Sequence, residues 1–260
     1  MASMQAMALA GRIEDNFLNR GASKSGVYAI KFYPLGVPVH IMVDDNIPRY
    51  NSNYPKYARY GENDRTWSML MEQGFAKLHG NYSRISGGIS SYGVSYLNGS
   101  PYEYYFPTST TEQGYWDWTI DKMDNNGLVL AGTPCTNGSD DTVNDQGLVN
   151  CHQYAIIDHA ILTNGQKLLK IRNPWGSERY YGPYSDLATG SNALSQSDLD
   201  YLNNNGHSHV KQDDGEFWIR SEDFYAFTDI LTNNPDVAAL GWHHAWHLTL
   251  DDDGTGGQPG

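Results

Sequence analysis

Two polar residues stand at the ends of neighbouring apolar segments. His152 begins the segment HQYAIID, and Asn173 ends the segment KLLKIRN. Thr163, Asn164 and Gly165 lie between the two segments and favour a turn. Consecutive strands usually pair, and antiparallel pairing across this turn would place the start of the first strand beside the end of the second. The pattern therefore predicts that the His152 and Asn173 side chains meet.

A histidine held by the side-chain carbonyl of an asparagine is one half of a catalytic arrangement. In a Cys-His-Asn site the imidazole is the base that deprotonates a thiol, and the amide orients the imidazole. A structural interpretation also fits, because Asn173 and Pro174 form an ordinary turn initiator and a histidine can begin a strand without a chemical role. The residues themselves leave both interpretations open.

The elements that would position this pair begin with helices and a strand pair. Residues 1–20 favour a buried helix, because their Ala and Met side chains are apolar on most sides. The segment VYAIKFYPLGVPVHIMVDD favours two strands around a turn at Leu35 and Gly36. The segment RTWSMLMEQGFAKLHG has apolar residues at helical spacing and a helix stop at Gly80. The polar stretch of residues 86–111 is the predicted boundary between two lobes.

Beyond that boundary the pattern turns to strands. A shorter helix is expected near residues 116–125, followed by the strand segments LVLAGTP, HQYAIIDHAILT, KLLKIRN and GEFWIRSEDFYAF. Residues 185–214 are rich in Ser, Asn, Asp and Gly, which favours a surface loop with little helix. A helical part followed by a strand-rich part predicts an α+β protein with two lobes.

Composition argues against several classes of function. The chain has 260 residues, 39% of them hydrophobic, which suffices for one large unit or two lobes. The formal net charge of -13 argues against nucleic-acid binding, because phosphate contacts need clustered Lys and Arg. No stretch has the length of a membrane span or the basic start of a signal peptide. Two cysteines are too few for a disulfide framework, so the sequence favours a reducing compartment, the cytoplasm.

Several segments give the chain a family resemblance. GLVNCHQYAI, KLLKIRNPWG, DDGEFWIRSEDF and TWSMLMEQGFAKLHGNYSRISGG resemble the signature segments of the calpain protease core, and VPVHIMVDDNIP is similar to its paired strands. The resemblance covers residues 26–230. It implies a papain-like fold with a helical first lobe and a β-rich second lobe. It also implies a cysteine endopeptidase that performs limited intracellular proteolysis on a protein or peptide substrate in the interlobe cleft.

The resemblance assigns roles to three residues. His152 corresponds to the general base, Asn173 to its orienter, and Trp175 to an aromatic residue that shields their hydrogen bond from water. Residues 1–110 would then be the C-terminal part of the first lobe, and residues 111–231 the second lobe. Residues 232–260 would be a linker or the start of a following domain, with a disordered tail.

The nucleophilic cysteine implied by the resemblance matches no residue of this chain. In the family it begins a buried helix, whose N-terminus favours a thiolate, and MASMQAMALAG resembles the continuation of that helix. The cysteine and the oxyanion-hole glutamine would therefore precede Met1. Cys151 adjoins His152 on a strand and so points to the opposite face, while Cys135 is expected to be a small buried filler. The chain is predicted to be inactive by itself.

Calcium is the cofactor that the resemblance implies, with one ion in each lobe held by acidic side chains and backbone carbonyls. The candidate ligands in the second lobe are Asp186, Asp214 and Glu216. Arg179 stands where a further second-lobe ligand is expected, and Tyr92 stands where a first-lobe acid is expected. We therefore expect no first-lobe ion and at best a weak second-lobe site.

Two other interpretations stay open. One is a catalytically inactive, calpain-like binding or regulatory module that keeps the cleft, with His152 and Asn173 as inherited scaffold. The other is a different papain-like hydrolase or a relative of the transglutaminases, which the signature segments disfavour.

Overall fold

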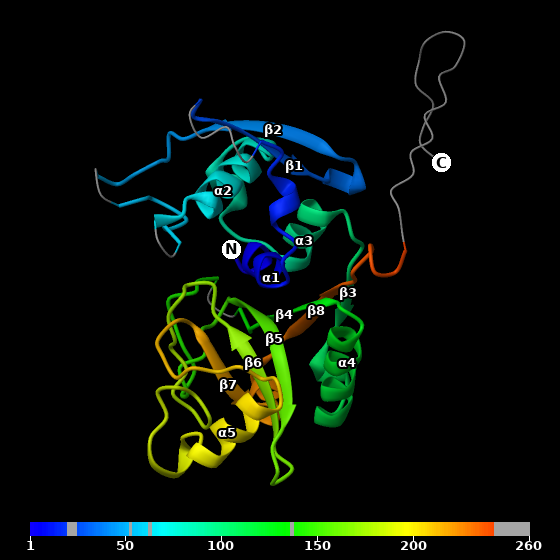
Figure 1. Cartoon of the computed structure of the whole chain (residues 1–260), viewed down its shortest axis with the longest axis vertical. Helices are drawn as coiled ribbons and strands as arrows, with labels where there is room; N and C mark the ends of the chain where they lie inside the picture. The colour runs from blue at the N-terminus through cyan, green and yellow to red at the C-terminus, as the bar shows by residue number, and fades with distance from the viewer. Residues whose placement is uncertain (20–24, 52–53, 62–63, 136–137, 242–260) are drawn as a thin grey trace.

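The structure is a computed structural model that describes residues 1–19, 25–51, 54–61, 64–135 and 138–241 (Figure 1). Within these residues, helices and two antiparallel sheets form the expected α+β fold. The helices are α1 (Ala2–Leu9), α2 (Trp67–Leu78), α3 (Ser90–Asn98), α4 (Glu112–Asp124), α5 (Gln196–Asn204) and α6 (Ser221–Phe227). The strands are β1 (Val27–Phe32), β2 (Val39–Asp44), β3 (Glu103–Tyr105), β4 (Leu128–Gly132), β5 (Gln153–Ile161), β6 (Lys167–Arg172), β7 (Glu216–Arg220) and β8 (Ile230–Asn234).

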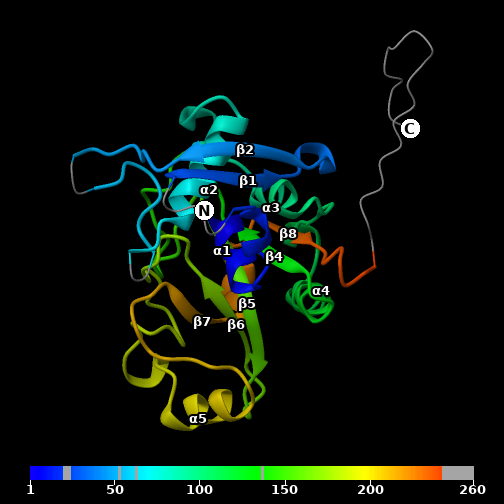
Figure 2. The same cartoon turned by 45° about the horizontal axis from the view of Figure 1, so that its top comes forward.

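The two sheets lie in separate parts of the molecule, one above the other in Figure 1. The upper part contains the β1–β2 hairpin with α2 and α3, and the lower part contains a six-stranded sheet in the order β3-β8-β4-β5-β6-β7. Helix α1 lies between the two parts (Figures 1 and 2). This is the two-lobed arrangement that the predicted fold class requires.

Helix α1 is buried where the two parts meet. Met7 is 1% exposed, and Ala2 and Ala6 are also buried, because the helix contacts α3, β4 and β5 at once. The helix is shorter than the sequence predicted and ends at Leu9. Gly11 follows with a φ of 69°, a left-handed conformation that terminates helices.

The β1–β2 hairpin confirms the sequence prediction. The two strands pair along their whole length, and Leu35 and Gly36 turn the chain with φ of 52° and 78°. Gly74 of α2 packs against the Phe32 ring of β1, where an added Cβ would stand 3.0 Å from a ring carbon. Gly80, the predicted helix stop, follows α2 with a φ of 100°.

The β5–β6 hairpin also forms as predicted. Ala155 near the start of β5 lies opposite Arg172 at the end of β6, and Gly165 turns the chain with a φ of 85°. Apolar side chains from this sheet and from α4 and α6 form a core. Its fully buried members include Tyr115, Tyr154, Leu169, Ile171, Tyr180, Phe217, Ile219 and Phe224.

Helix α3 lies inside the polar stretch that was predicted to separate the lobes. Val94 and Leu97 bury one side of this helix, and Gly99 ends it with a φ of 74°. Gly93 lets α3 approach α1, because a Cβ at this position would overlap the side chain of Ser3. The sequence did not predict this helix, which has a low apolar content and packs against α1.

Two further helices lie where the sequence favoured loop or strand. Helix α5 lies within residues 185–214 and begins with a capping box between Ser195 and Asp198. The segment GEFWIRSEDFYAF is a strand only as far as Arg220, and α6 then follows. Ser221 is fully buried at the first position of α6.

Some predictions stay untested by the fold. The lobe boundary between residues 110 and 111 stays a prediction, although β3, just before it, already pairs with β8 in the six-stranded sheet. The predicted disordered tail falls on residues 242–260, which lie outside the described residues. Among the residues that are described, no helix is long and apolar enough to cross a membrane.

Candidate active site

The His152 and Asn173 side chains meet, as the hairpin pattern predicted. His152 stands immediately before β5 and Asn173 immediately after β6. The His152 Nε2 and Asn173 Oδ1 atoms are 2.9 Å apart. His152 is 6% exposed and Asn173 is fully buried, so little water competes for this hydrogen bond.

The surrounding backbone fixes the direction of the Asn173 amide. Its Oδ1 also accepts a hydrogen bond from the Trp175 N–H at 3.1 Å, and its Nδ2 donates to the Ser177 carbonyl at 3.0 Å. The oxygen must therefore face His152, so His152 Nε2 is the donor. A neutral imidazole protonated at Nε2 keeps its lone pair on Nδ1, which is the atom that can accept a proton.

Thr133, just after β4, holds the backbone of His152. The His152 N–H donates to Thr133 Oγ1 at 2.9 Å, and the Thr133 N–H donates to the His152 carbonyl at 3.0 Å. The Thr133 hydroxyl in turn donates to the Val149 carbonyl at 2.7 Å. Sequence reasoning did not identify Thr133, because a threonine at a strand end carries no distinctive signal.

Electrostatics favour the neutral form of His152. Burial lowers the pKa of His152 below its ordinary value, while the hydrogen bond with Asn173 and the charge of Asp140 act in the opposite direction. A lowered pKa leaves the imidazole unprotonated near pH 7, which is the state that a general base requires.

Trp175 packs on His152. The two ring centroids are 4.7 Å apart, and the guanidinium of Arg179 lies 5.7 Å from the centroid of the Trp175 ring. Trp175 is nevertheless 43% exposed, so one side of its ring faces solvent. Its position agrees with a cover over His152, and the predicted shielding role stays a prediction.

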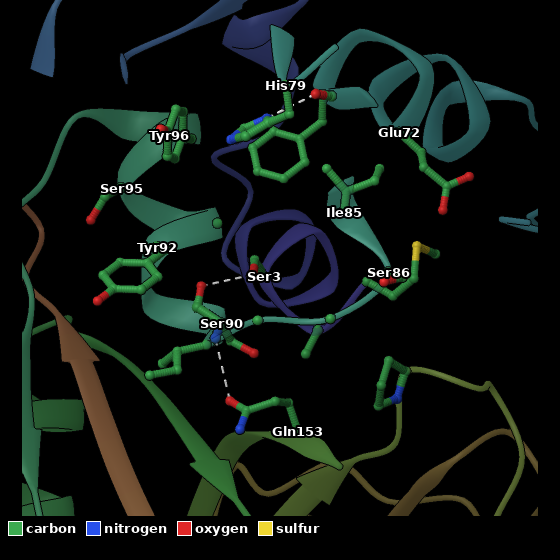
Figure 3. A pocket seen from close by; sticks show the side chains of 18 of the residues that line it. Ser3, Glu72, His79, Ile85, Ser86, Ser90, Tyr92, Ser95, Tyr96 and Gln153 are labelled. Atoms are coloured by element: carbon green, nitrogen blue, oxygen red, sulfur yellow. Dashed lines mark hydrogen bonds between the residues drawn. The ribbon is translucent and has the colours of Figure 1, made fainter. Parts of the chain in front are cut away.

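His152 lines a cleft of about 1320 Å³ that also reaches the first turn of α1. Ala2 and Ser3 contribute to the cleft wall. Figure 3 shows that Ser3 and Gln153 lie on either side of Ser90: the Ser3 hydroxyl donates to the Ser90 carbonyl at 2.8 Å, and the Ser90 N–H donates to Gln153 Oε1 at 3.4 Å. These bonds tie α1, α3 and β5 together at the cleft.

The two cysteines form a disulfide, Cys135–Cys151. The expectation of a buried filler at Cys135 was wrong, because this residue is exposed and covalently bonded. Neither cysteine offers a thiol to His152 in this form, which agrees with the prediction that neither is the nucleophile. A spacing of sixteen residues gave no reason to expect the pairing, which depends on how the loop after β4 returns to β5.

The candidate calcium ligands are already bound to cationic side chains and N–H groups. Asp186 Oδ1 lies 2.8 Å from His209 Nε2, and Asp186 Oδ2 accepts the Gln212 N–H. Glu216 pairs with Lys170 at 3.0 Å and with Arg172 at 2.9 Å.

Asp214 accepts hydrogen bonds from the Glu216 N–H and the Gln212 side chain. Within the part of the chain that the structure describes, no group of three or more His, Cys, Asp or Glu residues is placed to hold a metal ion. At the predicted first-lobe position, Tyr92 stacks edge-on against Tyr102.

Among the carboxyl groups that the structure describes, that of Glu178, beside this cluster, has a strongly raised pKa. It is 5% exposed, its Oε1 accepts the Asp186 N–H, and its Oε2 has no hydrogen-bond partner. Burial, and then the negative charge of Asp186, raises the pKa of Glu178 to about 8. A bound proton therefore neutralises Glu178 at neutral pH.

Glu178→Gln is expected to stabilise the protein at alkaline pH. In the unfolded state Glu178 releases its proton near pH 4.5, whereas in the folded state it keeps the proton up to about pH 8. The unfolding free energy of the wild type therefore falls as the pH rises through this window. The variant lacks this ionisation and should gain up to about 4 kcal/mol over the wild type by pH 8, and little at pH 4.5, because each pH unit of this window contributes about 1.4 kcal/mol. Urea denaturation at both pH values measures the difference.

The control for this measurement is Glu222→Gln, because the Glu222 side chain is 49% exposed. Its effect on the unfolding free energy should stay within about 0.5 kcal/mol at both pH values. A Glu178→Gln difference that does not change with pH would contradict the raised pKa.

Known proteins resemble this chain over most of its length. The family model described as calpain family cysteine protease matches residues 1–232. Similar proteins include the calpain-2 catalytic subunit of Homo sapiens, 26% identical over 88% of this chain and 32% of its own length, and calpain-8 of Rattus norvegicus, 28% identical over 87% and 32%. The calpain-type cysteine protease ADL1 of Oryza sativa subsp. japonica is 29% identical over 82% of this chain and 10% of its own length.

The chain thus spans about a third of the length of the calpain-2 catalytic subunit and of calpain-8, and about a tenth of the length of ADL1. The family model, in contrast, covers all eight strands of the described fold except the last two residues of β8. This chain belongs to the calpain family of cysteine proteases.

Proposed function

We propose that this chain supplies the base half of a calpain-type cysteine endopeptidase, which hydrolyses peptide bonds of protein substrates lying in the cleft. The observation that carries the proposal is the buried 2.9 Å hydrogen bond between His152 Nε2 and Asn173 Oδ1. It leaves the Nδ1 lone pair of a neutral imidazole as the proton acceptor. His152 is then the general base, Asn173 its orienter and Trp175 the cover over both.

The proposal places the nucleophilic thiol on the N-terminal side of α1. Ala2 and Ser3 line the same cleft as His152, so a cysteine preceding them would face the imidazole. A helix N-terminus also favours the thiolate. Because Cys135 and Cys151 are bonded to each other, this cysteine would belong to a longer polypeptide.

The chemistry then follows in two steps. His152 Nδ1 takes the thiol proton, the thiolate attacks the substrate carbonyl carbon, and the imidazolium returns the proton to the leaving amine. Water, deprotonated by the same nitrogen, then hydrolyses the thioester and regenerates the thiol. Both steps need the imidazole to keep one orientation, which is the role of Asn173.

The test of this function uses the natural protein. The transcript is sequenced upstream of the Met1 codon, and the polypeptide isolated from its source is assayed for cleavage of casein. We expect an in-frame cysteine before α1, cleavage that iodoacetamide abolishes, and a loss of about 10²-fold or more in His152→Ala. Cleavage that survives alkylation or the loss of His152 would exclude the proposal.

The alternative function is a calpain-like binding or regulatory module without protease activity. The disulfide favours this alternative for a polypeptide whose cysteines are Cys135 and Cys151, because both thiols are bonded to each other. The same experiment separates the two functions. A natural polypeptide without a cysteine before α1 that binds casein but does not cut it would establish the module.

A calcium requirement is not part of the proposal, since Asp186 is hydrogen-bonded to His209 and Glu216 is paired with Lys170 and Arg172. We expect 5 mM CaCl₂ to change the Tm by no more than 5 mM MgCl₂ does, within about 1 °C. A site occupied at 100 times its Kd would add about 2.7 kcal/mol and raise the Tm by several degrees. A calcium-specific rise of that size, measured by differential scanning calorimetry, would restore the second-lobe site.

The proposal also includes residues 111–231 as the second lobe and a cytoplasmic location. The location can be checked through the disulfide, because cytoplasmic glutathione and thioredoxin keep most exposed thiols reduced. Maleimide trapping during cell lysis should find Cys135 and Cys151 free if the protein is cytoplasmic, and a bonded pair would contradict that location.

A further inference from the structure

The Cys135–Cys151 disulfide lies directly beside the proposed base. Cys151 is the residue before His152 and lines the cleft, and Cys135 follows the Thr133-Pro134 segment that holds the His152 backbone. The Cys151 N–H donates to the Pro134 carbonyl at 2.9 Å. The disulfide thus joins the two backbone segments that determine where His152 lies, immediately before β5.

Cys151 has an unusual backbone conformation. Its φ is 50°, in the left-handed region that residues with a Cβ rarely adopt. The next N–H along the chain is that of His152, which donates to Thr133 Oγ1 at 2.9 Å. A change of Cys151 to a negative φ would redirect the His152 N–H and move the imidazole away from Asn173.

The loop closed by the disulfide is anchored independently of it. Leu148 and Val149 are fully buried, Asn144 Oδ1 accepts the Leu148 N–H at 2.9 Å, and the Tyr181 hydroxyl donates to the Asp145 carbonyl at 2.6 Å. Residues 142–150 would therefore keep their packing if the disulfide were opened. The constraint that would be lost is the one at Cys151.

We propose that the Cys135–Cys151 disulfide is a redox-sensitive positioning device, which keeps Cys151 left-handed and thereby holds His152 against Asn173. The inference rests on the proposed role of His152 as the base. Oxidised protein would have a correctly oriented imidazole, and reduced protein would lose that orientation without unfolding. Cys135 is exposed, so its sulfur is accessible to a reductant.

The switching chemistry is thiol–disulfide exchange with a dithiol. One thiolate of the dithiol attacks the Cys135 sulfur, which breaks the Cys135–Cys151 bond and releases Cys151 as a thiol after protonation. The second thiolate of the reductant then attacks the mixed disulfide, so that Cys135 leaves as a thiol. The protein gains two electrons and two protons, and the dithiol is oxidised to its cyclic disulfide.

The test follows the His152 Nε2–H in the NMR spectrum of the chain as it exists, with the signal assigned by His152→Gln. In oxidised protein this proton should exchange slowly with water. Reduction with dithiothreitol, or Cys135→Ser, should speed its exchange by about tenfold, because a left-handed φ disfavours a residue with a Cβ by roughly that factor. Unchanged exchange in both would overturn the proposal.

The decisive variant is Cys135→Ser combined with Cys151→Gly. Glycine adopts a left-handed φ freely, so this variant should restore slow exchange without a disulfide and should not respond to dithiothreitol. Failure of glycine to restore it would show that the disulfide does not act through the backbone of Cys151. If Cys135→Ser does not fold, reduced wild type replaces it as the protein without a disulfide, against which the glycine variant is compared.

An internal control separates positioning from general loosening. His209 Nε2 lies 2.8 Å from Asp186 Oδ1, far along the chain from the disulfide, and its signal should keep its exchange rate under all conditions. Equal acceleration at His209 and His152 would indicate global destabilisation and overturn the proposal. The result does not depend on peptide cleavage, so it stands apart from the test of the proposed function.

Discussion

Asn173→Ala should remove the hydrogen bond that orients the His152 imidazole. The substitution removes the acceptor of the His152 Nε2–H and leaves the Ser177 carbonyl and the Trp175 N–H without their side-chain partners. In a polypeptide that carries the thiol, we expect kcat/KM to fall about 10²-fold, the lower end of what a positioned base contributes. The unfolding free energy should fall by about 2 kcal/mol, since buried polar groups lose their partners.

The effect on His152 can be measured in this chain without the thiol. The Nε2–H signal of His152 should be lost in Asn173→Ala, because the ring can then rotate and exchange its proton with water. Urea denaturation of the same sample gives the change in stability.

Asn173→Asp is the matched control for the alanine variant. Aspartate keeps an oxygen for the His152 Nε2–H but cannot donate to the Ser177 carbonyl. We expect the His152 signal to persist and the His152 pKa to rise, because a carboxylate stabilises the imidazolium. If the Asn173→Ala variant of the thiol-bearing polypeptide has the same kcat/KM as the wild type, Asn173 has no role in the mechanism.

The centre of the candidate site could be predicted from sequence because it depends on local pairing. A two-stranded hairpin with a short Asn-Gly turn pairs the start of β5 with the end of β6, and this pairing brings His152 next to Asn173. The same holds for the β1–β2 hairpin around Leu35 and Gly36. In both, residues close in sequence determine the geometry. A bulge between Ile156 and Asp158 shifts the β5–β6 register by one residue, and the sequence pattern did not predict it.

The remainder of the site depends on contacts between distant segments. Thr133 reaches His152 from the preceding strand, and Cys135 reaches Cys151 only after the intervening loop has folded back. The amphipathic pattern of α3 is weak, and this helix forms because α1 packs against it. Local pattern cannot reveal such tertiary contacts. The capping box of α5, in contrast, was present in the sequence as Ser195 and Asp198 and could have been found.

Gly215→Ala should destabilise the loop that holds Asn173. Sequence reasoning did not identify Gly215. Gly215 has a φ of 87°, and its carbonyl accepts the Asn173 N–H at 2.8 Å. An added Cβ would stand 3.0 Å from both the Asn173 carbonyl oxygen and the Ser177 nitrogen. Both atoms are backbone, so they cannot move aside without displacing the loop.

Gly165→Ala provides the matched control, because Gly165 has a φ of 85° and no atom lies within 4 Å of its added Cβ. The Gly165→Ala variant should lose about 1–2 kcal/mol of unfolding free energy, which is the cost of placing a residue with a Cβ at a left-handed φ. Gly215→Ala should lose a further 1–3 kcal/mol or so from the overlap, and should release the His152 Nε2–H to exchange. Urea denaturation and the imidazole NMR signal measure the two effects separately.

Equal losses of stability in the two variants would mean that the Asn173 loop tolerates a methyl group at position 215, and that its close approach to Gly215 does not hold the amide in place. A larger loss in Gly215→Ala, together with a freely exchanging His152 proton, would link the glycine to the base through one route. That route runs from the Gly215 backbone to the Asn173 backbone, and from the Asn173 amide to the imidazole. The orientation of the proposed base would then depend on β7 as well as on β5 and β6, because Gly215 immediately precedes β7.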